Sequence, residues 1–103
     1  MTYRSRAHLD LVHDCPCFVD LPHECRGLSE PMHSNDLMFG RGASFKAPDW
    51  AVAAGCHAAH ALIDGRAGGL PKDEKRAAWL RAHIRTQNWL FSNRKLVVNK
   101  EAA

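Results

Sequence analysis

The chain has 103 residues, of which 46% are hydrophobic, and this is enough for one domain with a single modest core. No apolar run approaches the roughly 20 residues of a membrane helix, and no apolar segment follows the basic N-terminus as it would in a secretory signal. We therefore expect no membrane contact and a cytoplasmic location, where thiols stay reduced and cysteines bind metals more often than they form disulfides.

The net charge of +3 is divided unevenly along the chain. Residues 1–70 carry six Lys or Arg against eight Asp or Glu, a balance of −2, whereas residues 71–103 carry eight against three, a balance of +5. A basic C-terminal part favours a polyanionic partner, with nucleic acid the first candidate. A solvated helix face with additional Lys and Arg accounts for the same charge.

The first half of the chain has weak signals for regular structure. Residues 1–14 are polar without a clear period, and we expect the chain to be frayed there. Residues 15–25 contain two prolines and read as a short strand or knuckle, and residues 27–48 are rich in loop-forming residues. Residues 49–55 fit either state, because their alanines favour a helix whereas their place before a Cys/His cluster favours a strand.

The second half has clearer signals. A short helix is predicted over residues 56–63, and Gly65, just after it, is expected to end it. A longer helix is predicted over residues 73–91, with Asp73 as its N-cap after Pro71. Residues 96–98 predict a terminal strand.

The two sides of the longer helix differ in character. Its apolar side is predicted to pack in the core and consists of Ala77, Leu80, Ile84 and Phe91. Its basic side carries Arg81 and Arg85, four residues apart, with Lys75 nearby. This side either follows a phosphate backbone or faces water. Trp79, Trp89 and Phe91 are enough apolar surface for a homodimer contact, although core packing is their simpler use.

The cysteines have the order of a structural zinc site, which takes four tetrahedral ligands from two separate turns. The first group is Cys15, Cys17 and Cys25, and Cys56 begins the second group at a helix start. A second Cys-x-x-Cys pair is missing because position 59 is Ala59. Either Cys15 or His57 supplies the fourth ligand, or the zinc site is lost. Buried cysteines that act as small hydrophobic residues are the alternative.

The histidines add a second set of donors. His60 and Asp64 are four residues apart on the predicted short helix, so both can reach one ion from the same face. His57 precedes them and directly follows a cysteine. His33 stands alone in a polar loop.

Together these residues resemble the HNH-type nucleases, the ββα-metal or His-Me finger group, and in particular small nucleases encoded by lambdoid phages and prophages. The matching stretch covers roughly residues 17–66. It contains Cys17-Phe-Val-Asp-Leu-Pro-His-Glu-Cys25, His33, Lys46-Ala-Pro-Asp49 and Cys56-His-Ala-Ala-His-Ala-Leu-Ile-Asp64-Gly-Arg66. The last run is the most specific.

The resemblance implies one α+β domain over residues 1–103. Its ββα-metal (HNH or His-Me finger) core would cover residues 15–66, with zinc-knuckle-like cysteines, and a basic C-terminal helix and tail would cover residues 71–103. The implied activity is a metal-dependent DNA endonuclease of phage or prophage origin, acting in the cytoplasm of a bacterial host cell. Its cofactors would be Mg²⁺ or Mn²⁺ at the catalytic site and a structural Zn²⁺.

The resemblance also implies residue roles. His33 would be the general base, and Asp49 would orient it or support the metal. His60 would hold the divalent cation against the phosphate, with Asp64 as a further ligand. Charge and resemblance together name six residues as DNA-binding, namely Arg41, Lys46, Arg66, Lys75, Arg81 and Arg85.

This sequence departs from the family pattern at two positions. Many HNH enzymes have an acidic ligand directly before the first histidine, and here that residue is Met32. The second departure is Ala59. A zinc-stabilised nucleic-acid-binding module without catalysis is therefore the main alternative, and a small metal-stapled interaction protein is a further one.

Overall fold

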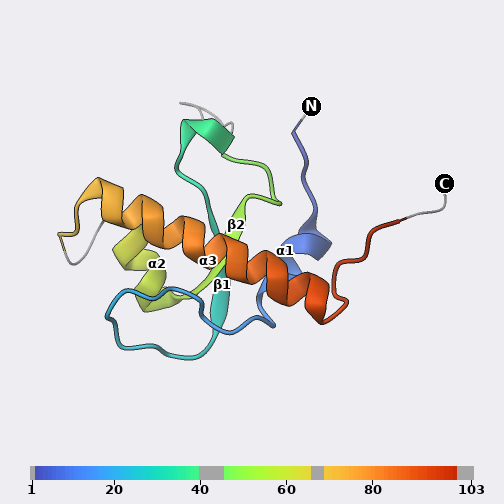
Figure 1. Ribbon diagram of the computed structural model, residues 1–103, viewed down its shortest axis with the longest axis horizontal. Coiled ribbons are helices and arrows are strands. Elements are labelled where there is room, and N and C mark those ends of the chain that lie inside the picture. Colours follow the sequence, from blue (N-terminus) through green and yellow to red (C-terminus); the bar gives the residue numbers. More distant parts are fainter. Residues whose placement is uncertain (1, 40–45, 66–68, 100–103) are drawn as a thin grey trace.

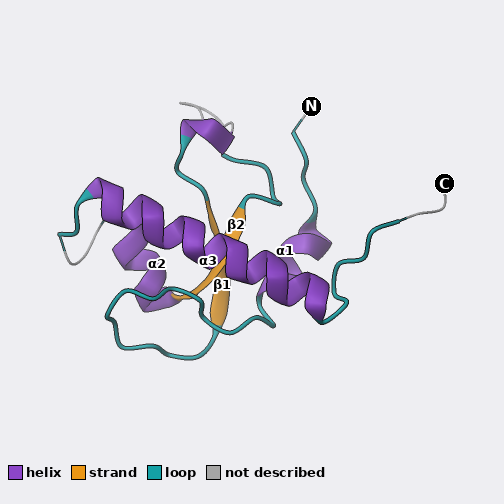
Figure 2. Cartoon of the chain, in the orientation of Figure 1, coloured by secondary structure: helices purple, strands orange, loops and turns teal. Residues whose placement is uncertain are grey.

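The structure, a computed structural model, describes residues 2–39, 46–65 and 69–99. Its elements in chain order are α1 (Arg6–Val12), β1 (Ser29–His33), the 3₁₀ turn η1 (Leu37–Phe39), β2 (Val52–Cys56), α2 (His57–Ile63) and α3 (Lys72–Ser92). Helix α3 crosses the two strands, with α2 beside its first half and α1 near its end (Figures 1 and 2). In the described part of the chain, no helix has the length and apolar character to cross a bilayer.

The two strands form an antiparallel pair that runs from Ser29 opposite Cys56 to His33 opposite Val52. Helix α2 begins directly after β2, so the central order is strand, strand, helix. The segment that fitted either helix or strand is therefore a strand, because β1 pairs with it and other elements cover it on both sides. Strand β1 itself lies in a part of the chain that was predicted only as loop-rich.

Strand β2 consists of small residues, and all five of them are buried. The closest approach is at Gly55, where a Cβ atom would lie 2.7 Å from the sulfur of Met32 and 3.1 Å from Val19. A larger residue there would require the buried side chains of Met32 and Val19 to move. The Ala- and Gly-rich sequence of β2 is thus what allows close packing around it.

Two groups of buried side chains hold the elements together. The larger lies around β1, β2, α2 and α3 and consists of Val19, Met32, Ala53, Cys56, Ala59, Ile63, Ala78, Trp79 and Ala82. The smaller joins α1 to β2 and to the end of α3 and consists of Val12, Cys15, Val52, Ala54 and Leu90. Removal of these apolar side chains from water is the main driving force for the fold.

Helix α3 also covers the free edge of β2. The N–H of Ala54 donates to Thr86 Oγ1 at 2.8 Å, and the carbonyl of Val52 accepts from His83 Nδ1 at 2.7 Å. The N–H of Phe18 donates to the Ala54 carbonyl at 3.0 Å. An open strand edge presents unpaired N–H and C=O groups, so these bonds satisfy the edge of β2 that faces away from β1, where no third strand pairs with it within the described residues.

A further link joins α3 to the loop before β1. Arg81 donates to both carboxylate oxygens of Asp20, at 2.7 and 2.8 Å, and Arg85 Nη1 donates to one of them at 3.0 Å. Hydrogen bonds from Arg81, reinforced by Arg85, lower the pKa of the Asp20 carboxyl to about 2. The loop that carries Cys17 and Cys25 is thereby fixed to the helix.

The predicted apolar side of α3 is confirmed for Leu80, which packs against the larger core group, but not for Ile84 and Phe91. Ile84 is 65% exposed and Phe91 is 48% exposed. The buried face consists instead of Ala78, Trp79, Ala82, Thr86 and Leu90. The spacing of four between the small residues of this set forms a ridge that lets α3 approach β2 closely, and the sequence pattern of large apolar residues did not show it.

Other expected elements also differ. Residues 6–12 form α1 rather than a frayed segment, because the Ser5 hydroxyl caps this helix by accepting from the His8 N–H. Pro71 rather than Asp73 is at the N-cap position of α3, without a side-chain cap, and Asp73 lies in its first turn. Residues 96–98 form no strand. Trp79 packs in the larger core group, so its apolar side chain is buried within the chain and needs no dimer contact to cover it.

Replacement of Thr86 tests the covering of the β2 edge. Thr86→Val keeps the shape of the side chain but leaves the buried Ala54 N–H unpaired, and the Ala82 carbonyl also loses its bond to the hydroxyl. We expect the free energy of unfolding to fall by about 1–3 kcal/mol. Urea unfolding followed by circular dichroism measures this. Thr86→Ser keeps the hydroxyl and should lose less, so equal losses in the two variants would contradict the role of the hydrogen bond.

Acid titration tests the link through Asp20. Its pKa of about 2 in the folded chain lies below its ordinary value of 3.8, so its stabilisation is complete above pH 4 and is lost as the pH falls towards 2. The stability difference between the wild type and Asp20→Asn should therefore shrink between pH 4 and 2. Solvent screening keeps this difference small, because the arginines are half exposed. A stability difference between the wild type and Asp20→Asn that stays constant over this pH range would contradict the link.

Candidate functional site

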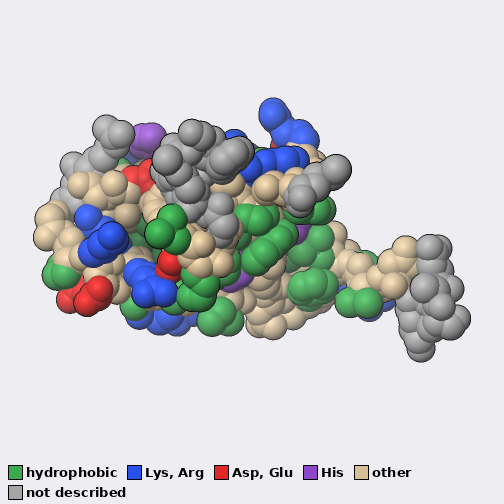
Figure 3. Space-filling model, turned by 90° about the horizontal axis from the view of Figure 1, so that it is seen from above, with side chains coloured by type: hydrophobic (Ala, Val, Ile, Leu, Met, Phe, Trp, Pro, Cys, Tyr) green, Lys and Arg blue, Asp and Glu red, His purple; other side chains and the backbone are tan. Residues whose placement is uncertain are grey.

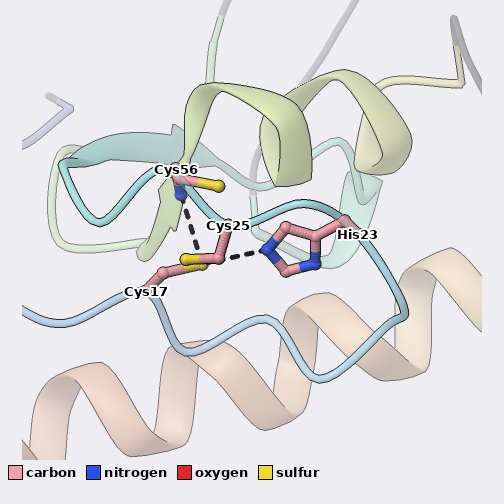
Figure 4. A group of neighbouring side chains, drawn as sticks. All are labelled: Cys17, His23, Cys25 and Cys56. Atoms are coloured by element: carbon pink, nitrogen blue, oxygen red, sulfur yellow. Dashed lines mark hydrogen bonds between the residues drawn. The ribbon is translucent and has the colours of Figure 1, made fainter.

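Four potential metal ligands from distant parts of the chain meet at one end of β2. They are Cys17, His23, Cys25 and Cys56, and one ligand atom from each lies within 4.8 Å of all the others. Figure 4 shows the first three on the loop between α1 and β1, facing the fourth at the start of α2. The set consists of three sulfurs and one imidazole nitrogen, a usual combination for structural zinc. The four side chains are thus close enough to bind a metal ion, consistent with zinc.

Backbone hydrogen bonds place the loop against the strand. The N–H of Cys56 donates to Cys17 Sγ at 3.3 Å, next to the bond between Phe18 and Ala54 that closes the loop onto β2. Cys56 is both the last residue of β2 and the N-cap of α2. The fourth ligand is therefore held by two secondary-structure elements, which is the rigidity that a structural site needs.

The ring of His23 is oriented by its own loop. Its Nδ1 lies 2.6 Å from the carbonyl of Leu21, and a carbonyl only accepts, so Nδ1 carries the hydrogen. The other nitrogen, Nε2, then has a free lone pair and lies 3.6 Å from Cys17 Sγ. A carbonyl that fixes the tautomer in this way is the usual outer partner of a metal-bound histidine.

The thiols differ in acidity. Burial opposes ionisation of Cys56, but hydrogen bonds from the backbone of Arg26 and Ala59 and from the neighbouring thiols outweigh it and lower its pKa to about 6. Burial raises the pKa of Cys17, and the backbone N–H groups of Cys56 and Val19 offset only part of this. A thiolate is the form that binds metal, so Cys56 is already suited to the role.

The predicted fourth ligands are wrong. Cys15 ends the turn after α1 and is buried in the smaller core group, where burial and the nearby Asp14 raise its pKa to about 11. The side chain of His57 is 89% exposed and lies near Glu30 rather than near the sulfurs. The fourth potential ligand is His23. The sequence signal that could have indicated it is its position two residues before Cys25. Ala59, at the position of the missing cysteine, is buried in the core.

At the end of β1, His33 contacts a buried carboxylate. Its Nε2 lies 2.8 Å from Asp49 Oδ1, which also accepts from Arg4 Nη1 at 3.2 Å, while Asp49 Oδ2 accepts from the Ser5 N–H at 2.8 Å. Burial opposes ionisation of Asp49, but these hydrogen bonds, led by that of His33, lower its pKa. The structure thus brings together two predicted residues that are 16 positions apart.

His60 lies between two carboxylates. Its Nδ1 is 2.6 Å from Glu30 Oε1, and its Nε2 is 3.3 Å from Asp64 Oδ2. Burial raises the pKa of Glu30, but the hydrogen bonds and charges of His60 and His57 outweigh this and lower it. Glu30 was not predicted as a site residue, and it lies two positions before Met32, where the family pattern has its acidic residue.

The two histidines have separate partners. His33 is paired with Asp49, whereas His60 is paired with Glu30, which lies three residues before His33 on β1. Asn35 Nδ2 donates to Asp64 Oδ1 at 3.3 Å and so belongs to the surroundings of His60. His33 was expected to stand alone in a polar loop, but it is the last residue of β1 and is paired with Asp49.

The residues predicted to bind DNA differ in exposure and in whether their charge is already paired. Arg81 and Arg85 are engaged with Asp20, as described above. The side chain of Lys46 is exposed, and its backbone carbonyl accepts from Arg4 at 2.9 Å. Lys75 lies on α3 beside the end of α2. The two remaining residues, Arg41 and Arg66, lie outside the described residues.

Comparisons with known proteins bear on the fold. No family model matches the chain, and no curated protein matches it. A solved structure described as "Structure of a putative bacteriophage protein from Escherichia coli str. K-12 substr. MG1655" is similar, with a TM-score of 0.64 and 21% identity. The match covers 84% of this chain and 98% of that chain. At this identity the similarity shows a shared fold alone.

Metal analysis tests the cysteine group. We expect one zinc ion per purified chain, and His23→Ala should weaken zinc binding by more than the about 10–100-fold that loss of an outer partner costs. Competition with a chromophoric chelator measures the affinity. Cys15→Ala is the matched control, because it removes a cysteine outside the group, and it should keep the zinc. Equal zinc loss in both variants would contradict the assignment.

Proposed function

We propose that this protein is a metal-dependent endonuclease that hydrolyses phosphodiester bonds in DNA. The observation that carries the proposal is the hydrogen bond from His33 to the buried Asp49. It stands at one end of a strand–strand–helix arrangement whose other end carries a group that can bind zinc, and the resemblance to HNH nucleases implies such an arrangement.

The pairing suits His33 to act as a general base. An ionised carboxylate only accepts hydrogen bonds, and the lowered pKa of Asp49 keeps it ionised, so Nε2 of His33 carries the hydrogen. In the neutral ring, Nδ1 then has the free lone pair that can take a proton from a water molecule. Asp49 is a positioning residue in this mechanism, because it fixes the tautomer and the ring orientation and later stabilises the protonated ring.

The residues around His60 fit a divalent cation. Glu30 accepts from Nδ1–H, so Nε2 is left free, and the Asp64 carboxylate lies on that side of the ring. One imidazole nitrogen and one carboxylate suit Mg²⁺ or Mn²⁺, which commonly keep water and phosphate oxygens as their remaining ligands. When bound, such an ion supplies charge stabilisation on the phosphate. Glu30 is the outer partner that the sequence pattern did not show.

The proposed origin is a phage or prophage, and the proposed partner is DNA in the cytoplasm of a bacterial host. The shared fold with a protein described as bacteriophage-derived supports this origin, together with the family resemblance of residues 17–66. The basic C-terminal part supports a polyanionic partner.

A zinc-stabilised nucleic-acid-binding module without catalysis is the second candidate. Its supporting observation is the contact of Asp49 with Arg4 and Ser5, which gives the same carboxylate a use in fixing the N-terminal segment. In that case the pairing of His33 would be part of the same structural network.

Replacement of His33 separates the two candidates. His33→Ala should lower plasmid nicking in Mg²⁺ or Mn²⁺ by about 10²–10⁴-fold, the usual contribution of a general base, while DNA affinity stays within about twofold. His13→Ala removes a histidine outside both carboxylate pairs and should keep the nicking rate. Persistent nicking in His33→Ala, or none in the wild type with either ion, would contradict the endonuclease.

A further inference from the structure

A cavity of about 420 Å³ lies between η1, the end of α2 and the first turns of α3. Ligand pockets in proteins commonly have about 300–1,000 Å³, so this one is large enough for a small organic molecule. Lys and Arg side chains gather at the end of the molecule where α3 begins (Figure 3). Neither the cysteine group nor His33 lines the cavity.

One wall of the cavity is cationic. Lys72, Lys75 and Arg76 line it from one face of α3, at spacings of three and four residues. Arg76 is engaged in an ion pair with Asp36. Lys72 and Lys75 have no side-chain partner within the described residues, so their charges are available to an anionic ligand.

The rest of the lining includes apolar residues that are held in place by their contacts. It contains Ile63, Leu80, Phe39 and Trp79. The indole of Trp79 is fixed by a hydrogen bond from Nε1 to the Met32 carbonyl at 2.9 Å. The ring of Phe39 meets it edge to face, with centroids 5.3 Å apart. Trp79 is itself buried and stacked on His83, so the partly exposed Phe39 and Leu80 present the apolar surface to the cavity. An aromatic ring such as that of Phe39 accepts a nucleobase without regard to its identity.

The cavity adjoins the proposed catalytic ion. Asp64 lines it and also lies 3.3 Å from His60 Nε2. Lys75 marks the same rim, because a Cβ atom on Gly65 would lie 2.8 Å from its Nζ. A ligand in the cavity would therefore have its anionic part near both the free lysines and the ion ligands.

We infer that this cavity binds one unpaired nucleotide of a DNA strand, with its base on the apolar side and a phosphate at Lys72 and Lys75. The inference rests on the proposed function and names its substrate class, which is DNA with a displaced, flipped or single-stranded nucleotide. A paired base stays within the duplex stack and reaches a cavity of this kind only after it leaves the stack. The arginines that could follow a duplex backbone, Arg81 and Arg85, are held by Asp20.

Fluorescence anisotropy tests this with a labelled dT8 oligonucleotide and a blunt hairpin duplex at the same low salt concentration. The wild type should bind dT8 more tightly than the duplex. Lys72→Gln combined with Lys75→Gln should weaken dT8 binding about 10-fold, because two phosphate contacts are lost. The matched control is Arg94→Gln with Lys95→Gln, which removes the same charge at the other end of α3 and should change it less than twofold. Circular dichroism confirms that both variants fold.

Two results would overturn the inference, namely equal weakening in the two double variants, or duplex binding as tight as that of dT8. The test also separates it from the proposed function. Cavity-dependent dT8 binding without any nicking would contradict the endonuclease alone. Unchanged dT8 binding and nicking in the Lys72→Gln, Lys75→Gln variant would contradict the nucleotide site alone.

Discussion

A two-stranded sheet is at best marginally stable in water by itself. In this protein, the helices and the loop before β1 pack around the β1–β2 pair and cover it. Strand β2 is buried along its whole length, with the two core groups on its sides. The hydroxyl of Thr86 and the ring of His83 form hydrogen bonds with backbone groups of Ala54 and Val52, on the edge of β2 that faces away from β1. Because β2 is built from alanine and glycine, α3 and the preceding loop can come close enough to make these contacts. The position of every site residue follows from this packing.

The cysteine group strengthens the same strand at its far end. Cys56 belongs to β2 and to α2, and the loop that brings the other ligands is held by Asp20 to α3. A metal ion in this group would therefore connect the loop, the strand and two helices at one point. In a chain of 103 residues, whose core is necessarily small, such a connection is the usual supplement to hydrophobic burial.

Two histidines outside the cysteine group, His33 and His60, have the same kind of hydrogen-bond arrangement. Each has one ring nitrogen on a carboxylate, Asp49 for His33 and Glu30 for His60. In each case the carboxylate is kept ionised by its hydrogen bonds, so the hydrogen of the ring is fixed on one nitrogen and the other is left as a base or a ligand. The two pairs differ in exposure and partners, which suits one to proton transfer and the other to an ion.

The sequence by itself determined the short-range features. The α2 and α3 helices, the choice of Cys17, Cys25 and Cys56 as candidate metal ligands, and the spacing of His60 and Asp64 all follow from local pattern and helical geometry. Tertiary structure decided the features that depend on which side chains come close together. His23, rather than Cys15 or His57, completes the cysteine group. His33 pairs with Asp49, and small residues form the buried face of α3. The reason is that small residues and a closing loop decide which side chains meet, and neither has a periodic signal in the sequence.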